Sequence, residues 1–129
     1  MVAMSTTTIA QTFSSTARMD IHEMTRQLNA HLGPTIVAAL AGAKDKGQAI
    51  RWARPDGPEP RPDVVARLQL AHRAWTHLAV AENEHIARAW FLGGNPFLGE
   101  DTPVTAIRED RRKQVMDAVA ALLEDRPAI

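Results

Sequence analysis

The apolar residues of this chain recur at intervals of three and four, which places them on one face of an α-helix. The first such run comprises Ile21, Met24, Leu28 and Leu32. Asp20 stands before it as a helix N-cap, and Gly33 with Pro34 ends it. The longest run comprises Val64, Leu68, Ala71, Trp75 and Leu78. No segment shows the apolar–polar alternation of a β-strand, so the pattern predicts an all-α fold.

Turn and capping residues divide the rest of the chain into further helices. We expect helices over residues 35–43 and 48–54, the second ended by Pro55. The later helices have the expected N-caps Asp63, Asn83, Thr102 and Asp110. The last of them would turn Val115, Val119 and Leu122 inward.

Three segments follow from this division. Residues 1–19 are rich in Ser and Thr without an apolar period, and are expected to form a flexible N-terminal arm. Residues 20–81 would form a first helical domain, interrupted by a proline-rich loop over 55–62. Residues 82–129 would form a second. At 129 residues, the chain suits one domain or two very small modules that share a core.

Composition narrows the function. Fifteen Lys and Arg balance fifteen Asp and Glu, which excludes a protein that holds nucleic acid by bulk charge alone. The absence of cysteine excludes disulfides, zinc–thiolate sites and thiol nucleophiles. No apolar run approaches the roughly 20 residues of a membrane span, and the N-terminus lacks the pattern of a secretory signal. We therefore expect a cytoplasmic protein without membrane contact.

The motifs of common enzymes are absent. There is no phosphate-binding glycine loop and no nucleophile elbow, and the serines occur only at positions 5, 14 and 15. Glu82 and His85 have the spacing of a di-iron ligand pair, but a second such pair is missing. His72 and His77 fall on different helix faces, each expected to be partly exposed. We expect neither an enzyme nor a metal or other cofactor.

A helix–turn–helix pattern is the stronger signal. The helix over 35–43, a turn over 44–47 and the helix over 48–54 have the lengths of a positioning helix, a tight turn and a recognition helix. The expected DNA-binding residues are Lys44, Lys46, Gln48, Arg51 and Arg54. Residues 44–73 hold seven basic against four acidic side chains, whereas residues 100–129 hold five against seven. Trp52 is expected to pack in the core.

The chain also resembles a known family. The motif comprises Trp90, Asn95, Pro96, Leu98 and Gly99, followed by Thr102-Pro103-Val104 and an amphipathic helix. With the upstream stretch from Leu40 to Arg67-Leu68, it is similar to Xre/MbcA/ParS-type antitoxins over roughly residues 30–126. The resemblance implies an Xre-like helix–turn–helix bundle followed by a small helical toxin-binding domain.

The resemblance further implies the antitoxin of a type II toxin–antitoxin system. Such a protein sterically neutralises a RES-domain toxin that consumes NAD, and binds its own operator DNA. A homodimer that forms a hetero-oligomer with the toxin is implied as well. The residues expected to approach the toxin active site are Glu124, Asp125, Arg126 and Ile129. Asn95 would satisfy backbone amides in a turn and Gly99 would adopt a positive φ, so the motif would shape the domain.

Two alternatives stay open. The chain could be a stand-alone helix–turn–helix transcriptional regulator without a toxin. It could also be an interaction module whose helix–turn–helix has lost DNA binding.

Overall fold

The fold is all-α, as the periodicity predicts. The computed structural model describes residues 19–124, in which there are seven α-helices, one 3₁₀ helix and no strand. The helices are α2 (Ile21–Leu32), α3 (Pro34–Ala41), α4 (Lys46–Trp52), α5 (Pro62–Ala81), α6 (Glu84–Leu92), η1 (Pro96–Leu98), α7 (Pro103–Arg108) and α8 (Arg112–Glu124). The arm expected over residues 1–19 lies almost entirely outside the described residues.

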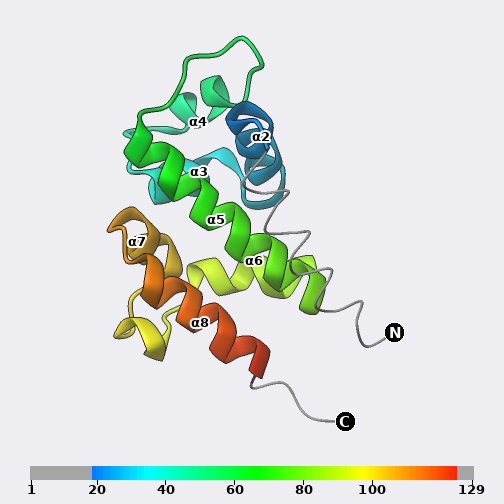
Figure 1. Ribbon diagram of the computed structural model, residues 1–129, viewed down its shortest axis with the longest axis vertical. Helices are drawn as coiled ribbons and strands as arrows, with labels where there is room; N and C mark the ends of the chain where they lie inside the picture. The colour runs from blue at the N-terminus through cyan, green and yellow to red at the C-terminus, as the bar shows by residue number, and fades with distance from the viewer. Residues whose placement is uncertain (1–18, 125–129) are drawn as a thin grey trace.

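The long helix α5 organises the molecule. It runs through the middle, and α2, α3, α6, α7 and α8 all pack against it (Figure 1). The whole predicted seam of this helix, from Val64 to Leu78, is buried. Helices from both ends of the chain therefore pack on one axis.

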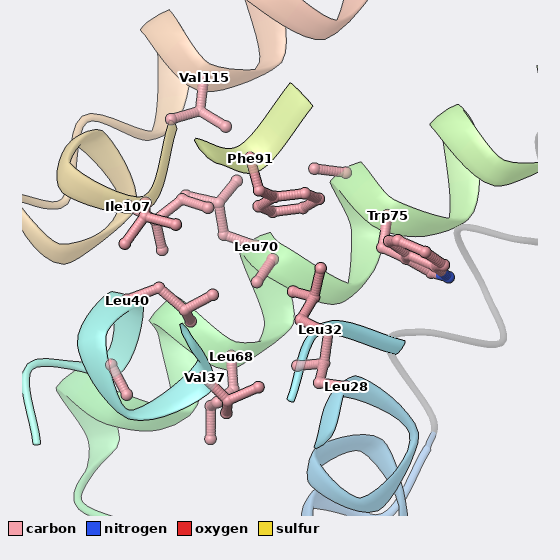
Figure 2. Packing of buried hydrophobic residues seen from close by; sticks show 14 of the residues in the cluster. Leu28, Leu32, Val37, Leu40, Leu68, Leu70, Trp75, Phe91, Ile107 and Val115 are labelled. Atoms are coloured by element: carbon pink, nitrogen blue, oxygen red, sulfur yellow. The ribbon is translucent and has the colours of Figure 1, made fainter. Parts of the chain in front are cut away.

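A single buried cluster extends across residue 81, where the sequence suggests a boundary. Leu28 and Leu40 from the first half meet Phe91 and Ile107 from the second around α5 (Figure 2). Helix α3 packs directly on α7. The two segments therefore share their hydrophobic core.

Local capping is predicted correctly where the cap needs only its own helix. The Asp20 carboxylate accepts from the amides of His22 and Glu23. Asn83 Oδ1 accepts from the Ile86 amide at 2.9 Å, and Thr102 Oγ1 from the Thr105 amide at 3.1 Å. These contacts satisfy amides that a helix start leaves without a partner.

Two predicted caps are wrong. Asp63 lies inside the first turn of α5, because Pro62 occupies the first helical position, where its missing N–H costs nothing. Asp110 adopts a φ of 61° before α8, which begins two residues later. Its carboxylate binds Arg67 instead of a helix amide.

The turn before α4 also differs from the prediction. Helix α3 begins at Pro34 and ends at Ala41, because Gly42 takes the left-handed conformation with φ 80°. Helix α4 begins at Lys46 and ends at Trp52, two residues earlier at each end than expected. Asp45 Oδ1 caps it by accepting from the Gly47 amide at 2.8 Å. The turn therefore spans residues 42–45, with Gly47 inside the helix.

Candidate nucleic-acid interface and partner-binding face

Helix α4 is held from its inner side by side chains of α2. Ala49 and Trp52 are buried in the core. Asn29 Nδ2 donates to the Ala49 carbonyl at 3.0 Å, and His22 Nδ1 lies 2.8 Å from the Trp52 carbonyl. Because a carbonyl only accepts, Nδ1 of His22 carries a proton. These contacts fix the orientation of a helix that is too short to be stable alone.

The outer side of α4 and the turn before it carry exposed cations. Lys44, Lys46, Arg51 and Arg54 are exposed. None of the four lies within 4.0 Å of a carboxylate oxygen in residues 19–124. The Arg51 guanidinium extends back along the helix, since a Cβ on Gly47 would lie 3.2 Å from its Nη1. These four predicted residues are thus exposed on α4 and the segments that flank it, which together we call the basic surface, and their charges are available to a partner.

Gln48, the fifth predicted residue, has a different surrounding. It is half-buried and lines a hollow of about 420 Å³ between α4 and the start of α5. Lys44, Glu59 and Arg61 line the same hollow. The Gln48 amide is therefore at the edge of the basic surface and less accessible than Arg51.

The proline-rich loop folds back on the end of α4. The Gly57 amide donates to the Arg54 carbonyl at 2.9 Å, and a Cβ on Gly57 would lie 2.0 Å from the Arg51 carbonyl oxygen. Pro60 is buried, and Glu59 lies 3.6 Å from His22 Nε2. Position 57 therefore requires glycine. The sequence pattern did not indicate this, because the close contact is with a backbone oxygen of α4.

Arg67 contributes to the charge count but not to the basic surface. Its Nη1 donates to the Ala41 carbonyl at 2.9 Å, and its Nε donates to Asp110 Oδ1 at 2.9 Å. The hydrogen bond between them lowers the pKa of Asp110 and raises the pKa of Arg67. Arg67 therefore joins the end of α3 to the turn before α8.

The motif of the resemblance has the structural roles expected of it. Asn95 Oδ1 accepts from the Phe97 amide at 2.9 Å. Pro96 begins η1, Leu98 is fully buried, and Gly99 has a φ of 64°. The half-buried Trp90 ring packs edge-on against Phe91, with centroids 5.1 Å apart. The motif thus shapes the corner between α6 and α7.

Phe97 is an exposed aromatic residue of this corner, and the sequence pattern did not single it out. Phe97 is 62% exposed, although the next residue, Leu98, is fully buried. With Asp117, Ala120, Ala121 and Glu124 of α8 it lines a shallow hollow of about 470 Å³. Asp125, Arg126 and Ile129, also expected to contact a toxin, lie outside the described residues.

In residues 19–124 no three or more His, Asp or Glu side chains are grouped closely enough to hold a metal ion. Glu82 caps the end of α5 while His85 belongs to α6, so the two are on separate helices. His72 is buried, contrary to prediction, with Nε2 2.9 Å from Gln27 Oε1 of α2. Burial, with a smaller contribution from the charge of His31, lowers the pKa of His72. No helix in the described part of the chain is long and apolar enough to cross a membrane.

Comparisons with protein-family models, curated proteins and solved structures give no match to this chain. The functional interpretation accordingly depends on the surfaces described above and on the motif.

Proposed function

We propose that this protein is the antitoxin of a type II toxin–antitoxin system, which binds operator DNA through α4 and a RES-domain toxin through its C-terminal face. The observation that carries the DNA part is the group of exposed cations on and beside α4, which have no acidic partner in the described residues. The helix that presents them is anchored on its other side by buried residues and two side-chain hydrogen bonds.

The chemistry of these residues suits DNA. Arg51 can donate two hydrogen bonds to a guanine edge in the major groove, which is the commonest specific contact. Lys44, Lys46 and Arg54 can contact phosphates, and each such contact releases about 0.9 counterion. A homodimer would present two copies of α4 to half-sites separated by about 34–36 Å. Binding should therefore be specific and strongly salt-dependent.

The toxin part rests on the motif and on the surface that it shapes. Phe97 is a large apolar side chain that a partner can cover, and aromatic residues are enriched at the centres of protein interfaces. It lies next to the end of α8, from which residues 124–129 would extend toward the toxin. Neutralisation would be steric: the antitoxin covers the NAD-binding active site and performs no chemistry.

A gel shift with the DNA upstream of its own gene tests the first part. We expect retardation of this DNA at low salt, and weaker retardation of a shuffled duplex of the same composition. Equal retardation of the two duplexes would leave only non-specific binding. No retardation at low salt, with or without toxin, would refute DNA binding and favour a pure interaction module.

Co-expression with the product of a neighbouring RES-type reading frame tests the second part. We expect the two proteins to co-purify and the toxin's NAD consumption to be suppressed in the complex. A Phe97→Ala variant should weaken this suppression, whereas Arg112→Ala, an exposed residue at the start of α8 that does not line the hollow, should not. DNA binding without any toxin complex would instead support the stand-alone regulator.

A further inference from the structure

Arg108, in the C-terminal half of the chain, lies beside the turn that leads into α4. It is the last residue of α7, which packs on α3 (Figure 1). A Cβ placed on Gly42 would lie 3.8 Å from Arg108 Cγ. Gly42 opens the turn that contains Lys44, so tertiary packing brings Arg108 next to the start of the basic surface.

The charge of Arg108 is available, because the neighbouring acids are engaged elsewhere. Asp110 holds Arg67, and Asp101 and Glu109 lie within 3.5 Å of Arg111. Arg108 itself is exposed and has no carboxylate oxygen within 4.0 Å in residues 19–124. It is thus an unneutralised cation like Lys44 and Lys46.

Arg61, which is also close to the α3–α4 turn, provides a contrast. It lines the hollow next to Lys44, but its guanidinium lies 3.4 Å from an Asp63 carboxylate oxygen. The charge of Asp63 therefore offsets the charge of Arg61, and the pair attracts a phosphate only weakly. Arg67, whose Nη1 would lie 2.9 Å from a Cβ on Gly42, is likewise paired with Asp110. Of these three arginines, Arg108 is the one whose charge favours a polyanion.

We infer that Arg108 binds a phosphate of the DNA backbone and that the DNA-binding surface therefore includes both halves of the chain. This inference rests on the proposed binding of DNA by α4. A phosphodiester next to the start of α4 would meet Lys44 from the turn, Lys46 from the first residue of α4 and Arg108 from α7. DNA affinity then depends on α7 being docked against α3, in addition to the helix–turn–helix itself.

The test measures DNA affinity of the full chain by fluorescence anisotropy over a series of salt concentrations. Arg108→Ala should weaken binding to the upstream duplex and to a shuffled duplex equally, by about two- to five-fold at low salt. The slope of log affinity against log salt should become shallower by about 1. Thermal unfolding should stay unchanged, because the side chain is exposed.

Arg112→Ala is the matched control. Arg112 is also exposed, but it lies beside Arg73 on α5. Arg73 is six residues, and so about 9 Å along the helix, beyond Arg67. This variant should keep the wild-type slope. If Arg108→Ala binds DNA with the affinity and salt dependence of the wild-type protein, the inference about Arg108 is wrong, but the proposed function is not affected. Absence of binding by the wild-type protein would overturn the proposed function together with it.

Discussion

Replacement of Trp52 by Ala tests the claim that α4 is a core-anchored helix. Only 9% of Trp52 is exposed, and its ring belongs to the same buried cluster as Ala49 and Leu28. Its main-chain carbonyl also accepts the proton of His22 Nδ1. Truncation therefore removes the largest apolar contact of α4 with the rest of the molecule.

The magnitude follows from the buried area. A buried aromatic side chain removes roughly 150–250 Å² from water. At about 25 cal/mol per Å², this corresponds to about 4–6 kcal/mol as an upper estimate. Measured large-to-small substitutions of this kind cost about 3–5 kcal/mol, which we expect here. The free energy of unfolding of a small domain is about 5–15 kcal/mol, so a variant that loses this much should be only marginally stable.

Urea unfolding followed by far-ultraviolet circular dichroism measures this loss. Arg51→Ala, on the outer side of the same helix, is the control and should change the free energy of unfolding by less than about 0.5 kcal/mol. Two results would refute the reasoning: a loss below about 1.5 kcal/mol for Trp52→Ala, or a comparable loss for Arg51→Ala. Either would mean that α4 is oriented differently.

Three further predictions concern the shared core, the buried histidine and the Arg67 contact. Phe91→Ala should cost about 3–5 kcal/mol in a single urea transition, and two separate transitions would contradict a core common to both halves. Because burial lowers the pKa of His72, the unfolded chain binds this proton more readily than the folded chain; stability should therefore fall as the pH drops below about 6.5. Between about pH 7 and pH 5.5, the free energy of unfolding of His72→Gln should decrease less than that of the wild-type protein. An equally steep decrease in the variant would disprove the role of His72. Asp110→Ala removes the acceptor of Arg67 and should cost about 1–2 kcal/mol. Asp110→Gly should cost less because φ is 61° there; equal losses would show that the backbone strain is negligible.

Features that depend on neighbouring residues could be predicted from the sequence. The seam of α5 follows from apolar residues three and four apart, and Asn83 caps α6 through an amide three residues away. Asp110 has the residue type of a cap, but a side chain 43 residues away captures its carboxylate. His72 is buried because Gln27 of another helix provides a polar partner. Such contacts are set by tertiary packing, which periodicity does not report.

The same distinction applies to the candidate interface. The exposure of Arg51 follows from its place opposite the buried Ala49 and Trp52 on one helix. The charge count was less informative, because it included Arg67, whose guanidinium is occupied by Asp110. It also assigned Arg108 to the acidic C-terminal segment, although packing places it beside the α3–α4 turn.

The central claim is that the outer side of α4 reads DNA, and the most direct test compares the affinity for upstream and shuffled duplexes. We predict that the wild-type protein prefers the upstream duplex, and that Arg51→Ala loses about 1–3 kcal/mol of that preference while unfolding normally. Lys113→Ala, whose cation is paired with Asp117 on α8, should retain the preference. A wild-type protein without preference, or an Arg51→Ala variant that keeps it in full, would contradict the account.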